Sequence, residues 1–198
     1  ITIAVLFPKE AYLDEHYWHL PLKGIHKAVS ELSEMGIKHE LHVFEIGSAK
    51  SFEKESEKIL SKKPDALITV PFFIKQCKRL TEESEKMGIP VVFIDTEMDF
   101  EINNKFSIHQ NSFQSGKVAA RILSQIITNT GRYIVLNIVS DSNSQKNNQE
   151  REAGFRTFFK NEIQTYTPNI DSFTVYQSEI DSLKKIFKPL TKTKEQIT

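Results

Sequence analysis

Several features that mark common classes of protein are scarce in this sequence of 198 residues. It has one cysteine, Cys77, and its 26 lysines and arginines balance its 26 aspartates and glutamates. A single cysteine excludes an intramolecular disulfide, and the balanced charge gives no reason to expect direct contact with nucleic acid. No apolar run approaches the roughly 20 residues that span a membrane. The soluble, single-cysteine composition fits a reducing compartment, and we expect a cytoplasmic protein.

Sequence motifs for cofactors and for catalysis are missing as well. The turn after the first expected strand has no Gly-x-Gly-x-x-Gly fingerprint, and the chain has no phosphate-binding loop and no Gly-x-Ser-x-Gly elbow. Cys77 lies at a core-type helical position without a neighbouring histidine, which argues against a nucleophile. His16 and His19 could share a helical face, but the sequence places no third metal ligand with them. We therefore expect no cofactor, no metal and no enzymatic activity.

What the sequence does have is an alternation of apolar runs and amphipathic stretches. Apolar runs typical of strands cover residues 1–7, 41–46, 65–70, 88–95, 106–108, 133–139 and 173–176. Helical spacing of apolar residues indicates helices within residues 25–35, 52–60, 74–87, 114–127, 148–160 and 183–187. Ser51 is the expected cap of the second helix. The alternation predicts an α/β fold built on parallel sheets flanked by helices.

A polar stretch between residues 96 and 105 interrupts this alternation. We interpret it as a crossing between two lobes, an N-terminal lobe of residues 1–105 and a partial C-terminal lobe of residues 106–198. In the second lobe, the helix at residues 114–127 gathers apolar side chains on one face, namely Val118, Ala119, Ile122, Leu123 and Ile126.

The stretch from Gly88 to Asp95 is the most informative one, because a run of apolar residues ends in a carboxylate. Such a run is typical of a buried strand in a parallel sheet, and open α/β sheets bind ligands outside the carboxyl ends of their strands. Asp95 is therefore a candidate ligand-binding residue, although a helix cap or an ion pair would also explain it. If it only binds ligand, Asp95→Ala should abolish ligand-induced stabilisation and leave the ligand-free melting temperature within a few degrees.

Aromatic residues follow two of the expected strands. Tyr17 and Trp18 come after the first strand, and Phe72 comes directly after the third, in Pro71-Phe72-Phe73. An aromatic ring at the edge of a sheet can stack on the apolar face of a sugar. The alternative is that these rings pack into the core or under a neighbouring loop.

Arg151 is the candidate charged partner in the second lobe, near the start of a helix. A guanidinium presents several donors in a fixed fork, which suits paired hydroxyls or a carboxylate. A surface ion pair with Glu150 or Glu152 is the alternative.

Four segments resemble, in the right order, the effector-binding core shared by lactose-repressor-type transcription regulators and periplasmic sugar-binding proteins. They are Tyr17-Trp18 before Leu22-Lys23-Gly24-Ile25, the strand at residues 64–68, the strand at residues 88–95, and Gln110-Asn111 with Gly116 followed by Arg151 with Gly154-Phe155. The resemblance implies a two-lobed periplasmic-binding-protein-like fold with a ligand cleft between the lobes. The residues that it places at the ligand are Tyr17, Trp18, Asp95 and Arg151, with Gln110 near the hinge.

The chain departs from the family pattern at several positions. Glu15-His16 replaces an asparagine-proline pair, and Gln110 replaces an aspartate. Thr96 stands where many sugar binders have an arginine, and residues 173–198 do not match the family's later strands. These departures leave the identity of the ligand open.

Three functions are compatible with these observations. We favour the ligand-sensing domain of a lactose-repressor-type regulator. The resemblance implies that it binds a small effector, a carbohydrate, and acts on DNA through an attached helix-turn-helix as a homodimer. The alternative is the extracytoplasmic sugar-binding domain of a transporter or membrane sensor. An α/β enzyme is the third, because a fold does not fix a function.

Overall fold

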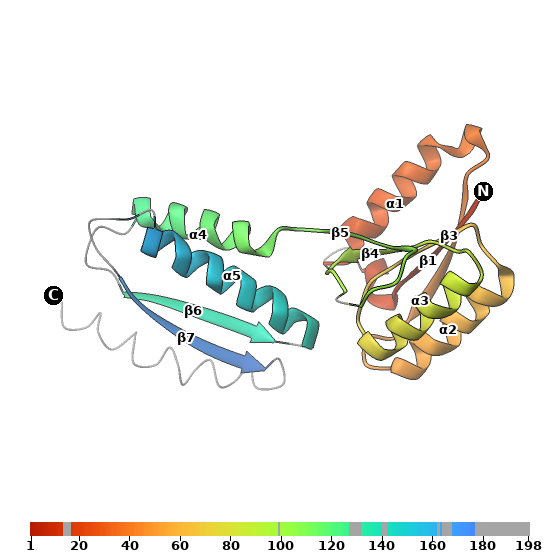
Figure 1. The fold of residues 1–198 in the computed structure, drawn as a ribbon. Coiled ribbons are helices and arrows are strands. Elements are labelled where there is room, and N and C mark those ends of the chain that lie inside the picture. Colours follow the sequence, from red (N-terminus) through yellow and green to blue (C-terminus); the bar gives the residue numbers. More distant parts are fainter. Residues whose placement is uncertain are drawn as a thin grey trace. The chain divides into compact units, whose positions relative to one another are not determined.

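The computed structural model describes residues 1–13, 17–98, 100–126, 132–139, 142–161, 163 and 168–176. The chain divides into two compact units, Ile1–His109 and Gln110–Thr198 (Figure 1). The last strand of the first unit, β5 (Lys105–His109), pairs in parallel with β4 (Val91–Asp95). Because of this pairing, the division falls after residue 109, whereas the sequence placed the boundary between residues 105 and 106.

The first unit is built on a five-stranded parallel sheet with the strand order β2-β1-β3-β4-β5. Its first three strands are β1 (Thr2–Pro8), β2 (Lys38–Phe44) and β3 (Ala66–Thr69). The chain steps from β1 to β2 on one side and returns to β3 on the other, so the order reverses beside β1. Open α/β sheets bind ligands at such a switch point, outside the carboxyl ends of the strands.

Helices cover both faces of this sheet, as the sequence predicted. Helix α1 (His19–Glu31) lies on one face, while α2 (Ala49–Lys62) and α3 (Ile74–Lys86) lie side by side on the other (Figure 1). Two short 3₁₀ helices, η1 (Lys9–Tyr12) and η2 (Ser33–Met35), flank α1. None of the helices that the structure describes is long and apolar enough to cross a membrane.

The cap of α2 differs from the expected one. The hydroxyl of Ser48 accepts a hydrogen bond of 3.1 Å from the backbone N–H of Ser51, and Ser48 has extended backbone angles. Both properties define an N-cap residue. The prediction that Ser51 caps the helix is therefore wrong. Ser48 is the N-cap, and Ser51 is the residue in the first turn whose backbone N–H donates to it.

The central strands of the first sheet form its core. Val5, Leu6 and Phe7 of β1 are fully buried, as are Leu67 of β3 and Phe93 of β4. A strand covered by helices on both faces has no polar side to present, which explains why the sequence shows continuous apolar runs here. The core holds the carboxyl ends of these strands in fixed positions.

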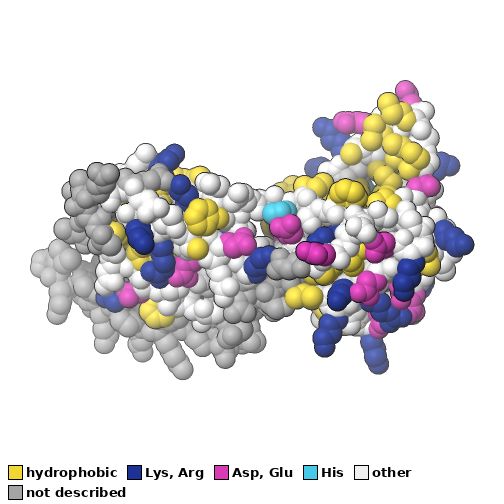
Figure 2. Space-filling model, viewed as in Figure 1, with side chains coloured by type: hydrophobic (Ala, Val, Ile, Leu, Met, Phe, Trp, Pro, Cys, Tyr) yellow, Lys and Arg dark blue, Asp and Glu magenta, His cyan; other side chains and the backbone are white. Residues whose placement is uncertain are grey.

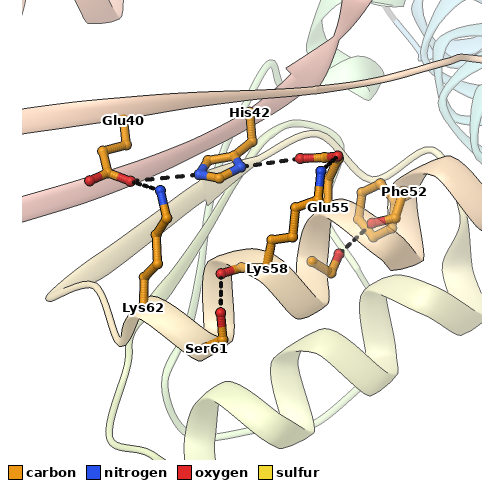
Figure 3. A network of polar contacts seen from close by, with 8 residues as sticks. Glu40, His42, Phe52, Glu55, Lys58, Ser61 and Lys62 are labelled. Carbon is orange, nitrogen blue, oxygen red and sulfur yellow. Dashed lines mark hydrogen bonds and ion pairs between the residues drawn. The ribbon is translucent and has the colours of Figure 1, made fainter.

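A polar network attaches the edge strand β2 to helix α2 (Figure 3). His42 lies between two carboxylates, with Nδ1 3.2 Å from Oε2 of Glu55 and Nε2 3.8 Å from Oε2 of Glu40. Lys62 donates to Glu40 over 2.6 Å, and Lys58 donates to Glu55. Burial opposes the ionisation of Glu55, but hydrogen bonds from Lys58 and His42 outweigh it and hold the pKa of Glu55 below its usual value. This network is structural, and it lies away from the carboxyl ends of the strands.

The second unit contains α4 (Ser112–Ile126), β6 (Arg132–Val139), α5 (Ser142–Asn161) and β7 (Asn169–Tyr176). β6 and β7 form a small parallel sheet. Its core residues are Ala120, Tyr133, Phe155, Phe158 and Phe159. The expected strands and helices of this lobe are confirmed as far as residue 176, and the helix expected at residues 183–187 lies outside the described residues.

Helices α4 and α5 approach each other through glycine. A Cβ atom added to Gly116 would lie 1.8 Å from the carbonyl oxygen of Arg151, and one added to Gly154 would lie 1.9 Å from that of Phe113. Neither distance is possible for a real side chain, so both positions require glycine. The contact face of α4 is consequently formed by small residues, which the structure shows to be Ser112, Gly116 and Ala120.

The apolar face that the sequence indicated on α4 is buried only in part. Leu123 is half-buried and packs against the second core, whereas the other large residues of that face are exposed. Val118, Ile122 and Ile126 are 54%, 53% and 71% exposed. Large side chains cannot occupy the face on which two backbones are in contact, and this close approach turns them outward. The prediction from apolar periodicity is wrong here because it assumes that a helix packs through its largest residues.

Candidate functional site

Asp95 lies at the carboxyl end of β4 and its carboxylate accepts two hydroxyl groups. The Tyr17 hydroxyl donates to Oδ1 over 2.6 Å, and the Thr96 hydroxyl donates to Oδ2 over 3.1 Å. Of the interpretations that the sequence left open, these contacts favour a hydroxyl-binding carboxylate. The groups that it holds are of the same chemical type as those of a sugar or a polyol.

The backbone of Asp95 has a positive φ of 82°. Non-glycine residues rarely adopt this conformation, and aspartate and asparagine do so more readily than others because their short polar side chains form local hydrogen bonds. Such strain is concentrated at functional sites in folded proteins. The position therefore selects for aspartate, asparagine or glycine, and only aspartate supplies a carboxylate.

Tyr17 and Trp18, which the sequence could not tell apart, have different environments. Trp18 is 9% exposed and belongs to the core, where its ring contacts Phe7 edge-on with the centroids 6.3 Å apart. Tyr17 is 59% exposed, and its ring meets that of Trp18 edge-on at a centroid distance of 4.9 Å. Trp18 thus positions the loop, whereas Tyr17 is the aromatic residue that faces the surface.

Phe72 is half-buried and joins Trp18 to the aromatic residues of the core. Its ring centroid lies 5.5 Å from that of Trp18 and 5.6 Å from that of Phe44. The connected rings form an aromatic cluster of Phe7, Trp18, Phe44, Phe52, Phe72 and Phe73. Each such pair contributes about 0.5–1.5 kcal/mol beyond its buried area. The aromatic cluster therefore holds Trp18, the ring that Tyr17 contacts, in place.

The two candidate residues of the second unit lie at the start of α4 and on α5. Gln110 is exposed and precedes Asn111, whose Oδ1 accepts the backbone N–H of Gln114 over 2.9 Å and so caps α4. Arg151 donates from Nη1 to Oδ1 of Asn148 over 3.4 Å, and Asn148 in turn donates to the carbonyl of Ile138 over 2.9 Å. Asn148 therefore ties the guanidinium of Arg151 to the end of β6.

Glu152, one of the acidic partners that the sequence offered for Arg151, has other partners. It accepts from Arg156 over 2.8 Å and from Ser172 over 2.7 Å. Burial opposes the ionisation of Glu152, but hydrogen bonds from Ser172, Asn137 and Arg156 keep its pKa below the usual value. Of the two ion pairs predicted as an alternative role for Arg151, the one with Glu152 is thus made by Arg156 instead.

Thr96 forms a hydrogen bond with Asp95, and Asn148 forms one with Arg151. The sequence had identified neither residue as a contact. Thr96 is 6% exposed and holds one oxygen of Asp95. The sequence signal for this contact was a residue with a hydroxyl group directly after the carboxylate that ends the strand. For Asn148, the signal was its position three residues before Arg151, which puts both on one face of a helix.

Other reactive groups do not form a second site in the part of the chain that the structure describes. Cys77 is fully buried, and its burial raises the pKa of the thiol to about 12. Such a group stays protonated at neutral pH. No cluster of three or more His, Cys, Asp or Glu side chains suited to a metal occurs among the described residues. His16 and Glu15 lie outside them, and Nδ1 of His19 lies 3.2 Å from the carbonyl of Ala11.

Comparison with known proteins extends this picture. The sequence profile described as "Periplasmic binding protein domain" matches residues 3–196. No curated protein sequence matches the chain.

Solved structures show the same fold. A protein from Bacteroides fragilis assigned as a LacI transcriptional regulator is 26% identical, with a TM-score of 0.76 over 96% of this chain and 66% of that one. A periplasmic solute-binding protein of an ABC transporter from Actinobacillus succinogenes, solved with D-allose, is 20% identical, with a TM-score of 0.70 over 95% of this chain and 65% of that one. A sugar-binding protein of an ABC transporter from Bacillus halodurans is 19% identical, with a TM-score of 0.66 over 88% of this chain and 55% of that one. This chain therefore spans less than two thirds of the length of those proteins.

Proposed function

This chain belongs to the periplasmic binding protein domain family, and from that premise we propose that it binds a small carbohydrate or polyol at the carboxyl edge of its first sheet. The observation that carries the proposal is the carboxylate of Asp95, which ends β4 beside the switch point and accepts two hydroxyls. Charge-assisted hydrogen bonds of this kind suit the hydroxyls of a sugar. Solute-binding proteins of similar fold, one of them solved with D-allose, support this ligand class.

We propose Asp95 as the ligand contact of the first unit, with Tyr17 beside it at the site, and Arg151 as the candidate contact of the second unit. Trp18 and Phe72 support them from the aromatic cluster. Gln110 lies where the two units join along the chain. The protein acts by binding and not by catalysis, and turnover of a bound sugar would contradict this.

We further propose that binding serves a transcription regulator in the cytoplasm. The LacI regulator from Bacteroides fragilis supports this role with 26% identity over nearly the whole chain. Ligand binding would shift a two-state equilibrium and so change the affinity of an attached helix-turn-helix for DNA. The second candidate, an extracytoplasmic binding domain, has support from the periplasmic solute-binding protein. A helix-turn-helix in the same gene product would favour the first, and a secretory signal the second.

A homodimer is the assembly that we propose, with α1 at its interface. Apolar side chains gather on the surface over α1 (Figure 2), and Leu20 is 73% exposed. The charges along this segment change sign, from Lys23 and Lys27 to Glu31 and Glu34. Two copies of α1 packed antiparallel about a two-fold axis would place each positive end beside the partner's negative end.

A thermal-shift screen tests the proposed ligand class. D-allose, D-ribose, D-fructose and glycerol are added to the wild type and to Asp95→Asn, with Glu82→Gln on α3 as a carboxylate-to-amide control. At about 100 times the Kd, binding adds about 2.7 kcal/mol to the stability of the folded state. We expect a rise of roughly 5–10 °C in Tm for the wild type and the control, and almost none for Asp95→Asn. Equal shifts in all three proteins would place the ligand elsewhere.

A further inference from the structure

The hydroxyl of Tyr17 sits on Asp95 as a ligand hydroxyl would. We infer that Tyr17 is an internal competitor, a latch that satisfies the carboxylate in the unliganded protein and has to be displaced when a sugar or polyol binds. The inference rests on the proposed function, because it concerns the same carboxylate. It adds a residue that sets the affinity of the site.

The two hydroxyls on Asp95 differ in how firmly they are held. Thr96 is 6% exposed and adjacent in sequence, so its bond to Oδ2 is part of the fold. Tyr17 is 59% exposed, and its bond to Oδ1 joins residues 78 positions apart. Of the two hydrogen bonds on the carboxylate, the one from Tyr17 is thus the more exposed.

The ring contact of Tyr17 with Trp18 does not oppose such an exchange. The ring of Tyr17 touches the edge of Trp18, which is fixed by Phe7 and Phe72 in the aromatic cluster. Displacement of Tyr17 would leave that cluster intact. The phenol group would move into water, where it keeps a hydrogen-bond partner.

The chemistry of the exchange is balanced, because one hydroxyl donor replaces another on Oδ1. The carboxylate at the strained position 95 is never left without a donor, so the unliganded site stays in the geometry that binds. The exchange also lowers affinity, since the ligand gains one charge-assisted hydrogen bond and the protein loses one. A ligand that offers only one hydroxyl therefore gains little binding free energy. A ligand binds when it also contacts other residues of the site.

The variant Tyr17→Phe tests the latch, because phenylalanine keeps the ring contact with Trp18 and removes only the hydroxyl. Calorimetric titrations with D-allose, D-ribose and D-fructose compare the wild type, Tyr17→Phe, Asp95→Asn and the double variant. We expect Tyr17→Phe to bind the sugars that the wild type binds with a Kd lower by roughly three- to tenfold, the range of one modest hydrogen bond. In the Asp95→Asn background, the same change should have no such effect, which a double-mutant cycle measures.

Trp18 is the single tryptophan of the chain and reports on Tyr17 directly, since their ring centroids are 4.9 Å apart. Sugar should change the Trp18 emission of the wild type, and the change should be smaller in Tyr17→Phe. Binding that is equal or weaker in Tyr17→Phe overturns the latch and leaves the proposed function standing. If neither the wild type nor Tyr17→Phe binds any of the three sugars or glycerol, the proposed function and the latch are overturned together.

Discussion

Asp95 has two separate roles at the scale of a single residue, one for its backbone and one for its carboxylate. Its φ of 82° restricts which residues fit the end of β4, and its two oxygens hold Tyr17 and Thr96. A residue with a Cβ atom and no local hydrogen bond costs roughly 1–2 kcal/mol in this left-handed region. Substitutions at this position therefore have to be chosen so that they change one role at a time.

The expected consequence is that Asp95→Ala destabilises the ligand-free protein by about 1–2 kcal/mol more than Asp95→Asn does. Asparagine tolerates the left-handed region, and glycine adopts it freely. Urea unfolding of Asp95→Ala, Asp95→Asn and Asp95→Gly at equal protein concentration measures this difference. The sequence alone suggested a change of a few degrees in melting temperature for Asp95→Ala, and a loss of about 1–2 kcal/mol corresponds to a change of that size. Equal stabilities of the alanine and asparagine variants would show that the backbone restriction is absent.

The candidate site could be predicted in part from these residues. Asp95 and Tyr17 followed from their places after β4 and β1, because the carboxyl ends of parallel strands share one edge. The burial of Trp18 could not be predicted, since two adjacent aromatic residues in a loop carry no periodic signal. The polar partner of Arg151 could not be predicted either, because Asn147 and Asn148 both lie within helical reach of it and Glu150 and Glu152 flank it.

At the scale of elements, the crossing of α4 and α5 depends on two glycines. An alanine at Gly116 would place its Cβ against the backbone of α5, and one at Gly154 would meet the backbone of α4. Backbone atoms cannot move aside as the end of a flexible side chain can. The two helices would have to separate, and the packing of Ala120 against Phe155 and Phe159 would loosen with them.

We therefore expect Gly116→Ala and Gly154→Ala each to destabilise the second unit by about 1–3 kcal/mol, the usual cost of overpacking a core. Gly24→Ala in α1 is the matched control, because nothing lies within 4 Å of a Cβ atom there. Alanine in a helix interior is favoured over glycine by roughly 0.5–1 kcal/mol, so the control should gain stability. Circular dichroism in urea compares the three variants. No loss in the first two would mean that the helices do not cross as described.

The elements themselves followed from the sequence to within a few residues, and the reasons differ between the units. Continuous apolar runs located β1, β3 and β4, since a doubly covered strand has only apolar side chains. The face of α4 did not follow, because a contact between backbones leaves no apolar side chain to detect. The cap at Ser48 was missed because two serines, Ser48 and Ser51, lie near the start of the helix and both are favoured N-cap residues.

On the scale of the whole molecule, the surface over α1 connects the fold to assembly. The exposed apolar residue Leu20 and the charges of reversed sign along α1 form a surface that is complementary to itself. A two-fold interface requires this property, because the same patch is used by both subunits. The rest of the surface of the first unit, over α2 and α3, is mixed in charge (Figure 2).

Leu20→Asp is expected to shift the protein from dimer to monomer, because it replaces an exposed apolar side chain of the proposed interface with a carboxylate. Sedimentation velocity over a hundredfold range of concentration measures the assembly. Ile74→Asp on α3 is the control, since Ile74 is an exposed apolar residue of the first unit as well. A wild type that is monomeric throughout would contradict the interface, as would a dimer that both variants leave unchanged.

The burial of Cys77 has a practical consequence for observing the protein at work. Its thiol is fully buried with a pKa of about 12, so thiol reagents will not react with it in the folded state. A cysteine introduced at an exposed position of each unit would then be the sole target of a maleimide dye, without any need to remove the natural one. Energy transfer between two such dyes would follow the units of a single molecule as sugar is added and withdrawn.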